Sequence, residues 1–514
     1  MGERAAGILL HPTSLPGPNG IGELGPEATA FLDFLRETGQ ALWQVLPLGP
    51  TGYGDSPYQC FSAFAGNPLL VSVDRLCDEG LLAASDLKKR PAFPEREVDF
   101  GPVIEFKRPL LAKAFAAFEK KAPPPRRAAL EAFTNEQAAW LRDFALFMAL
   151  KRANGGTAWS SWDRALVNRD EEALARARRE LGREALEVVF EQWLFFEQWA
   201  DVRRQAHERG IRIMGDIPIF VAQDSADVWA HPEIFHLAAD GRPSLQAGVP
   251  PDYFSATGQL WGNPLYRWDA LARTGYAWWV DRFRAVLALV DAVRLDHFRG
   301  FEAYWEVPGE AETAIDGRWV KGPGTAFFEA LRAALGQLPI VAEDLGVITP
   351  EVEALRDGYD FPGMAILQFA FGTDAQANDF LPHNYPRNKV VYTGTHDNDT
   401  VVGWWTAGVG NSTRTAAEVA REHERALAYC GGDGTAVHWD FIRTLFVSVA
   451  DTAIVPLQDL LGAGGEARMN LPGRAGGNWR WRFTASDLHP DIRARLRALT
   501  EGSGRCLPAR PPAS

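Results

Sequence analysis

The chain has few cysteines and lacks the short motifs of several common enzyme classes. Its four cysteines, at positions 60, 77, 430 and 506, are too scattered for a disulfide framework or a Cys-x-x-Cys metal site. No glycine-rich phosphate turn, no HExxH zinc motif and no GxSxG nucleophile turn occurs. These absences argue against dinucleotide-binding enzymes, zinc peptidases and serine hydrolases. The low cysteine content favours a reducing compartment, so we expect a cytoplasmic protein.

The sequence also lacks long apolar runs and an excess of positive charge. No stretch approaches the roughly eighteen uninterrupted apolar residues that a membrane helix needs. With 53 Lys and Arg against 66 Asp and Glu, the net charge of −13 repels a phosphate backbone. We therefore expect neither a membrane nor a nucleic acid as partner, and nothing in the sequence implies a required protein partner. The 46% hydrophobic and 23% charged residues are typical of a folded globular protein.

Eight short apolar runs end in polar or charged residues, and most are followed by a longer helical pattern. They span residues 7–10, 41–46, 211–214, 291–295, 340–342, 364–371, 390–392 and 452–455. Strands that alternate with helices predict βα units, and eight of them predict an α/β fold of the (β/α)₈ or TIM barrel type. An open doubly wound sheet is the alternative, but it usually carries a glycine-rich turn after its first strand.

Much of the chain must lie outside such a barrel, which needs about 250 residues. About 165 residues separate the second and third candidate strands, far more than an ordinary βα connection of about two to six residues and a helix. We expect the barrel to start in 1–56, a mainly helical insertion in 57–205, and the rest of the barrel in 206–500. Rim-loop insertions are expected near 222–266 and 462–477, and a flexible tail over 501–514.

Three acidic residues follow candidate strands, where barrel enzymes place their active sites. Asp296, Glu343 and Asp397 occupy these positions. Because strand residues two apart share a face, Arg294 should point the same way as Asp296 and keep it ionised. An ionised Asp296 and a protonated Glu343 would form the nucleophile and acid that glycosidic bond cleavage needs. The structural alternative is that each carboxylate only caps a helix or pairs with a surface base.

A metal site is the chemical alternative, since His, Asp and Glu also bind zinc. The ten His residues are dispersed, and neither a paired HxH motif nor a calcium loop of the DxDxDG kind occurs. We therefore expect no metal and no cofactor.

The acidic residues belong to segments that resemble the catalytic signatures of 4-α-glucanotransferases of the amylomaltase type, glycoside hydrolase family 77. These segments are Arg294-Leu295-Asp296-His297-Phe298, Ala342-Glu343-Asp344-Leu345-Gly346 and Gly394-Thr395-His396-Asp397-Asn398. Further family-like blocks start at His11, Asp55, Gly215, Gly248, Trp261 and Arg468. The resemblance therefore extends from the N-terminus to about residue 482.

The resemblance implies a retaining double displacement on α-1,4-linked glucans. Asp296 would be the nucleophile that forms a glucosyl-enzyme intermediate, and Glu343 the acid and later the base. Asp397 would stabilise the distorted sugar in the transition state. The substrates implied are maltooligosaccharides, amylose and glycogen-derived chains, in maltodextrin or glycogen metabolism.

Further residues are expected to bind the glucan. Arg294 and His396 would hold the nucleophile and the sugar hydroxyls at the cleavage subsite, with Asp216 nearby. The ring of Tyr58 would stack on the sugar there. Aromatic and polar side chains of the rim loops would bind neighbouring glucose units; these are Asp252, Tyr253, Phe254, Gln259, Trp261 and Asn470. A packing role for one or two of them is the alternative.

Transfer and hydrolysis differ only in the acceptor of the glucosyl group. An α-1,4-glucan hydrolase of the α-amylase type would use the same residues with water as acceptor. A site that excludes water and stacks the acceptor sugar favours transfer. A non-catalytic glucan-binding protein on the same barrel is a further alternative, which the variant Asp296→Asn tests.

Overall fold

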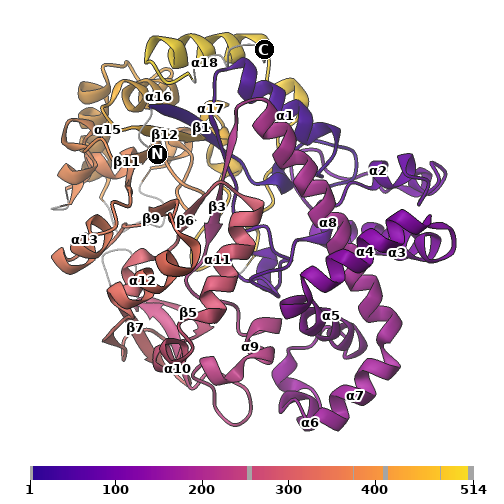
Figure 1. Ribbon diagram of the computed structural model, residues 1–514. Coiled ribbons are helices and arrows are strands. Elements are labelled where there is room, and N and C mark those ends of the chain that lie inside the picture. The colour runs from indigo at the N-terminus through magenta and orange to yellow at the C-terminus, as the bar shows by residue number, and fades with distance from the viewer. Residues whose placement is uncertain (1–3, 252–256, 374–375, 409–414, 475, 507–514) are drawn as a thin grey trace.

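The computed structural model describes residues 4–251, 257–373, 376–408, 415–474 and 476–506, and its centre is a barrel of eight parallel strands (Figure 1). The barrel strands are β1 (Ala5–Leu9), β2 (Leu42–Gln44), β3 (Arg212–Ile217), β6 (Ala292–Leu295), β9 (Ile340–Ala342), β10 (Gly363–Ile366), β11 (Lys389–Tyr392) and β12 (Thr452–Pro456). They pair in the order β10-β11-β12-β1-β2-β3-β6-β9. The N–H of Ala342 donates to Pro362 O over 2.9 Å, which joins β9 to the β10 end of the sheet. The predicted barrel is therefore confirmed.

All eight predicted strands exist, and two were predicted several residues too long. The run 41–46 contains strand β2 only over Leu42–Gln44. The run 364–371 contains strand β10 only as far as Ile366, and Leu367–Phe371 form a 3-10 helix. The side chains of Leu367 and Phe371 are buried, so an apolar run alone does not separate a strand from a buried helical turn.

Helices surround the barrel and cover the outer face of its strands. Those next to the strands are α1 (Pro26–Glu37), α8 (Gly182–Glu208), α11 (Ala277–Leu289), α12 (Gly324–Leu335), α13 (Pro350–Asp357), α16 (Val437–Val447) and α18 (Pro490–Gly502). Five further helices come between these along the chain: α9 (Ala226–Ala230), α10 (Trp268–Arg273), α14 (Val401–Thr406), α15 (Ala416–Cys430) and α17 (Leu457–Leu460). No helix in the described ranges is long and apolar enough to span a membrane.

The segment between β2 and β3 is mainly helical and extends to one side of the barrel, in purple at the right of Figure 1. It contains α2 (Val73–Asp78), α3 (Phe100–Lys121), α4 (Pro124–Glu136), α5 (Ala138–Ala153), α6 (Arg164–Val167) and α7 (Glu171–Glu180). The 27-residue helix α8 then returns the chain to the barrel and continues through residue 205 to Glu208. Trp199 near its C-terminal end donates its Nε1–H to Leu289 O over 2.9 Å, so α8 contacts α11 as well as the insertion.

A second, antiparallel sheet of four strands lies beside the barrel. Its strands are β4 (Leu245–Val249), β5 (Gln259–Pro264), β7 (Ala303–Pro308) and β8 (Arg318–Lys321), in the order β5-β4-β7-β8. Two of them fall in the rim loop expected near 222–266, where the sequence has no clear periodicity. The periodicity of a regular strand is absent here because the register shifts between Gln246 and Gly248 in the β4–β5 pair, which interrupts the alternation of side chains.

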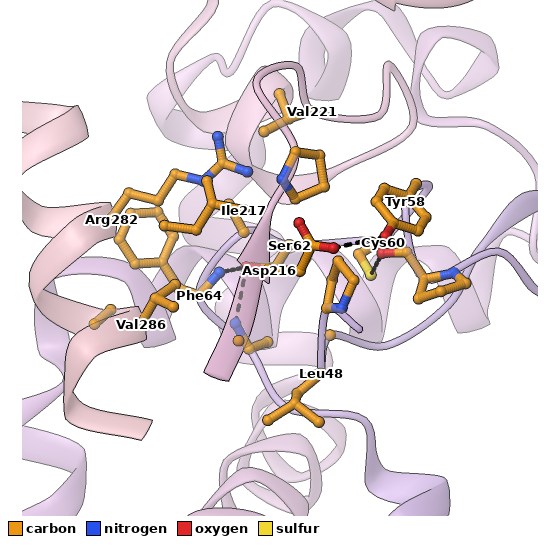
Figure 2. Close-up of a pocket in the computed structure, with 18 of the residues that line it drawn as sticks. Leu48, Tyr58, Cys60, Ser62, Phe64, Asp216, Ile217, Val221, Arg282 and Val286 are labelled. Atoms are coloured by element: carbon orange, nitrogen blue, oxygen red, sulfur yellow. Dashed lines mark hydrogen bonds between the residues drawn. The ribbon is translucent and has the colours of Figure 1, made fainter. Parts of the chain in front are cut away.

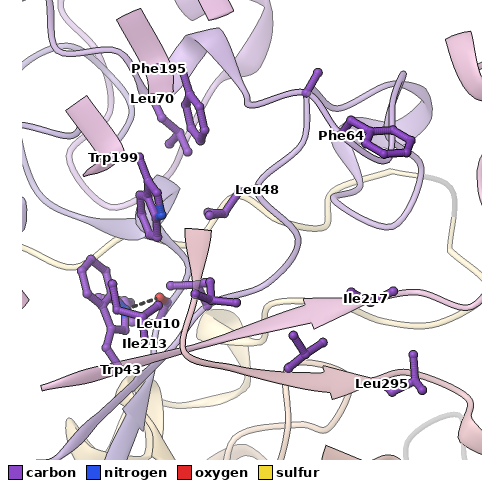
Figure 3. Packing of buried hydrophobic residues seen from close by; sticks show 14 of the residues in the cluster. Leu10, Trp43, Leu48, Phe64, Leu70, Phe195, Trp199, Ile213, Ile217 and Leu295 are labelled. Atoms are coloured by element: carbon purple, nitrogen blue, oxygen red, sulfur yellow. Dashed lines mark hydrogen bonds between the residues drawn. The ribbon is translucent and has the colours of Figure 1, made fainter. Parts of the chain in front are cut away.

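Two apolar layers hold the barrel, one inside it and one between strands and helices. Inward-facing side chains include Leu9, Leu42, Met214, Val341 and Ile454. The outer layer joins β2 to α8: the Trp43 and Trp199 rings lie 6.3 Å apart, and Trp43 Nε1–H donates to Leu10 O over 2.8 Å (Figure 3). Truncation of a fully buried Trp to Ala costs about 3 to 5 kcal/mol, so this contact fixes the insertion against the strands that carry the site.

Candidate active site

Strand register places Asp296 and Glu343 side by side at the carboxyl end of the barrel. Leu295 of β6 pairs with Ala342 of β9, and each acidic residue follows its paired neighbour directly. The N–H of Glu343 donates to Leu295 O over 3.1 Å, and the N–H of Phe298 donates to Glu343 O over 3.1 Å. The two carboxylate-bearing segments are thus hydrogen-bonded to each other on both sides of Glu343.

Arg294 joins two of the predicted acidic side chains. Its Nη1 lies 2.7 Å from Asp216 Oδ2 and its Nη2 lies 2.7 Å from Asp296 Oδ1. The register explains this, because Arg294 is paired with Asp216 of β3 and shares a strand face with Asp296. The Asp216 side chain is fully buried, whereas 27% of the Asp296 side chain is exposed. Arg294 therefore fixes the buried carboxylate of Asp216 and the accessible carboxylate of Asp296 relative to each other.

Burial and the neighbouring negative charge of Asp296 raise the pKa of Glu343 to about 7, although Arg294 opposes the shift. Its carboxylate accepts hydrogen bonds from the N–H of His297 at 2.8 Å and from the N–H of Leu345 at 2.9 Å. These two bonds orient both oxygens of Glu343. A carboxyl group with this pKa is protonated in a large fraction of molecules near neutral pH and can donate or accept a proton.

Asp397 is held by a second rim segment of the barrel. Its Oδ1 accepts from Asn470 Nδ2 over 2.6 Å, and His396 Nε2 lies 3.3 Å from Oδ2. Burial raises the pKa of Asp397, but His396 and the Asn470 hydrogen bond lower it more, so the net pKa falls well below the usual range. Arg468 donates to Asp397 O over 2.6 Å and to Asn470 O over 2.8 Å. Asp397 is therefore an ionised carboxylate with a fixed orientation.

Tyr58, in the segment that follows β2, lies at the same place. Its hydroxyl donates to Asp216 Oδ2 over 2.8 Å, and its ring stacks on His396 with centroids 5.1 Å apart and an interplanar angle of 16°. The ring of Trp479 lies 5.7 Å from Tyr58 and 5.8 Å from His396. Three chain segments that are distant in sequence thus meet in one aromatic cluster beside Asp216.

A cavity extends from Asp216 and Tyr58 toward helix α11, as Figure 2 shows. Cys60, Ser62 and Arg282 also line it. Burial raises the pKa of Asp216 to about 6 in spite of Arg294, and its Oδ1 has no hydrogen-bond partner among the described protein atoms. Asp296 and Glu343 do not line this cavity, which is bounded by the end of β3 that carries Asp216 and by α11.

The rim-loop residues predicted to bind glucan are described in part. Trp261 of β5 meets His297 edge to face with centroids 4.9 Å apart, and its Nε1–H donates to Gln259 Oε1 over 3.3 Å. Trp261 and Gln259 therefore lie next to the segment that follows Asp296. The predicted residues Asp252, Tyr253 and Phe254 lie outside the described residues.

Three residues at the site were not predicted to act there. Trp479 has φ +65° and is 5% exposed, an unusual backbone state for a large side chain. His297 has φ +51°, and burial lowers its pKa to about 4. Arg468 begins a recognised block, but only the structure shows that it binds two carbonyl groups. The sequence gives no sign that a Trp or His residue will adopt a positive φ. The position of His297 directly after Asp296, in contrast, was a sequence signal from which a role at the site could have been predicted.

The arrangement offers an accessible carboxylate beside a cation, a carboxyl group with a pKa near 7, and a second ionised carboxylate. A positive charge that develops on a sugar ring between them would be stabilised by the surrounding negative groups. No cluster of three or more His, Cys, Asp or Glu residues in the described part of the chain could hold a metal ion.

Comparisons with known proteins give one consistent result. The family model described as 4-alpha-glucanotransferase, glycoside hydrolase family 77, matches residues 10–487. A 4-alpha-glucanotransferase of Thermus thermophilus is 53% identical over 98% of this chain and 99% of its own length. One of Synechocystis sp. is 51% identical over 98% of both chains.

Solved structures agree with the sequence relatives. The amylomaltase of Streptococcus agalactiae in complex with acarbose superposes with a TM-score of 0.93 at 41% identity, over 98% of this chain and 100% of the other. The amylomaltase of Corynebacterium glutamicum superposes with a TM-score of 0.78 at 19% identity, over 98% of this chain and 75% of the other, a likeness of fold alone.

Proposed function

The chain belongs to the 4-alpha-glucanotransferase family, glycoside hydrolase family 77, and from this membership we propose specific roles for the carboxylates at the barrel mouth. The protein transfers a segment of an α-1,4-glucan to another glucan or to glucose, and it is not a hydrolase of the α-amylase type. Asp296 acts as nucleophile, Glu343 as acid and base, and Asp397 as the group that stabilises the transition state. Maltooligosaccharides, amylose and glycogen-derived chains are the proposed substrates.

In the first step the donor bond breaks. An oxygen of Asp296 attacks the anomeric carbon of the donor glucose while Glu343 gives its proton to the departing 4-oxygen. Arg294 Nη2 lies 2.7 Å from Asp296 Oδ1 and holds this carboxylate in place. The positive charge that develops on the donor ring lies near Asp397, which Asn470 and His396 hold in place. The products are a glucosyl ester on Asp296 and a released glucan with a free 4-hydroxyl.

In the second step an acceptor takes the glucosyl group. Formation of the ester removes the negative charge of Asp296, which is one of the causes of the raised pKa of Glu343. The pKa of Glu343 therefore falls in the intermediate, so that Glu343 now accepts a proton from the 4-hydroxyl of the acceptor. The acceptor oxygen attacks the anomeric carbon, the ester bond breaks, and Asp296 is released as a carboxylate. The configuration at the anomeric carbon is retained.

The remaining polar and aromatic residues bind and orient the sugar. Tyr58 presents its ring at the cleavage point and is held there by Asp216 and His396. Trp261 and Gln259 lie beside His297 and bind the glucose unit on the acceptor side, where stacking displaces water. This displacement favours a sugar hydroxyl over water as acceptor.

The cellular location is also part of the proposal. Cys60, Cys77, Cys430 and Cys506 are all free thiols. Free cysteines are typical of proteins in a reducing compartment, and we place the enzyme in the cytoplasm.

One observation carries the assignment of the carboxylates: the pairing of Leu295 with Ala342, which puts Asp296 and Glu343 at adjacent strand ends. The test of transfer is a product profile with maltotriose. We expect glucose and longer maltooligosaccharides to form while the total number of reducing ends stays constant. A steady rise in reducing ends would contradict transfer.

A further inference from the structure

Two tryptophans lie side by side on one face of the antiparallel sheet beside the active site. Trp305 of β7 is paired directly with Trp319 of β8, so both side chains lie on the same face. The neighbouring pair, Tyr304 and Val320, packs against the apolar core on the opposite face. Trp319 is 41% exposed, and it is the only exposed one among the eighteen tryptophans, all of which lie in the described ranges.

Trp319 is nevertheless held in place. The guanidinium carbon of Arg299 lies 3.8 Å from the centroid of its ring, and the ring of Trp305 meets it at 5.2 Å and 69°. Trp305 in turn donates its Nε1–H to Ala314 O over 2.8 Å. A Cβ atom at Gly317 would lie 2.1 Å from Trp305 Nε1, so glycine is required there to let Trp305 approach. An exposed indole with a fixed orientation loses little conformational freedom when it binds a ligand.

The segments around Trp319 also carry the catalytic carboxylates. Arg299 is three residues after Asp296, in the short 3-10 helix Phe298–Phe301. Its guanidinium donates to the carbonyl oxygen of Val347, which is four residues after Glu343. Val347 is 56% exposed, and Ile315, in the turn between β7 and β8, is 51% exposed. Trp319, Ile315 and Val347, here called the Trp319 platform, are exposed apolar side chains on the β7–β8 hairpin and on the segment that follows Glu343.

We propose that the Trp319 platform is an outer subsite for a glucan chain that extends beyond the cleavage point. This inference rests on the proposed function, since it concerns the same substrate. The apolar face of a glucose ring fits the exposed indole surface of Trp319. Only substrates long enough to reach the platform bind more tightly because of it.

The size of the platform favours a sugar chain over a protein partner. One indole and two aliphatic side chains offer far less than the roughly 800 Å² per partner that a stable protein interface buries. The charged side chains of Arg318 and Lys321 on the same edge strand also disfavour edge-to-edge pairing of two sheets. A linear glucan needs only one or two rings in contact.

The test compares Trp319→Ala with the parent on maltotriose and on progressively longer maltooligosaccharides up to amylose. We expect kcat/KM for maltotriose to stay within about twofold of the parent and kcat/KM for amylose to fall about five- to tenfold, through KM. Ile315→Ser, a surface change with no core contact to lose, should lower kcat/KM for amylose about two- to threefold. Tyr429→Ala, an exposed aromatic residue on α15, is the matched control and should change neither value.

A binding measurement separates this inference from the proposed function. In a Glu343→Gln background, calorimetric titration with a long maltodextrin should show about five- to tenfold weaker binding when Trp319→Ala is added. Unchanged binding, or an equal loss of activity on maltotriose and amylose, would overturn the subsite. A change in oligomeric state on sedimentation without a change in glucan binding would also overturn it and indicate contact between copies. A parent chain that does not disproportionate maltotriose would contradict the proposed function, while the titration would still decide the subsite.

Discussion

The backbone N–H of His297 donates a hydrogen bond to Glu343 Oε2 over 2.8 Å. His297 directly follows Asp296 and reaches this geometry with φ +51°, a left-handed conformation that is uncommon for residues other than glycine. The residue after the proposed nucleophile thus positions the proposed acid. Strained backbone of this kind often occurs at functional sites, where the surrounding structure enforces it.

The raised pKa of Glu343 predicts the alkaline limb of the pH profile. In the proposed first step the donor bond breaks only when Glu343 is protonated, and the pKa of Glu343 is about 7. For maltotriose, kcat/KM should therefore fall above about pH 7, approaching tenfold per pH unit, because this parameter reports the free enzyme. A profile that stays flat to pH 9 in steady-state measurements would contradict the role of Glu343.

The same shift predicts how Glu343→Gln changes stability with pH. The pKa rises from 4.5 in the unfolded chain to about 7 in the folded one, so the folded state holds the proton more tightly across this window. Stability of the parent should therefore decrease as the pH rises from about 5 to 8, while Gln has no proton to lose. The free energy of unfolding of Glu343→Gln relative to the parent should rise by about 1 to 3 kcal/mol between these two pH values. Urea unfolding at both pH values measures the difference in free energy of unfolding between variant and parent. A difference that does not change with pH would show that folding does not raise the pKa of Glu343.

The double ion pair of Arg294 predicts a large effect of a conservative substitution. Lysine carries one compact charge and cannot bond Asp216 and Asp296 in the geometry of a guanidinium fork. Arg294→Lys should lower kcat for maltotriose about a hundredfold or more, with a smaller change in KM. Arg203→Lys is the matched control, since Arg203 pairs with Asp291 at the opposite end of β6, and it should keep kcat within about twofold. Equal activity of the two variants would contradict the account of Arg294.

Trp479 predicts a positioning effect in the aromatic cluster. It contacts the rings of Tyr58 and His396 but is itself almost fully buried. Trp479→Leu should lower kcat/KM about tenfold because Tyr58 and His396 lose the ring that both contact. Trp479→Phe keeps an aromatic ring and should retain part of the parent kcat/KM. A purely structural role would instead lower the melting temperature and leave kcat and KM of the folded fraction unchanged.

The sequence predicts the barrel well because each strand is a short apolar run with a polar residue at its end. That signal is local, and the same rule marks Asp296, Glu343 and Asp397 as candidates. Arg294 was also predictable, since it lies two positions before Asp296 and therefore shares its strand face. The roles of these residues, in contrast, came from the resemblance of three motifs.

The rest depends on contacts between distant segments. Nothing local to Trp479 indicates that it meets Tyr58, because 421 positions separate them and the contact follows from closure of the barrel. The antiparallel sheet was missed because β4 contains a bulge and Gly248. The surface position of Trp319 could not be predicted either, since most tryptophans are buried.

The central claim is that Asp296 bonds covalently to the donor sugar while Glu343 moves the proton. Its most direct test is to incubate Glu343→Gln with an α-glucosyl fluoride, whose leaving group needs no acid, and to map the modified peptide by mass spectrometry. We predict that one glucosyl group is attached at Asp296, and that Asp296→Asn remains unmodified. A sugar attached to another residue, or no adduct while fluoride is released by inversion, would contradict the account.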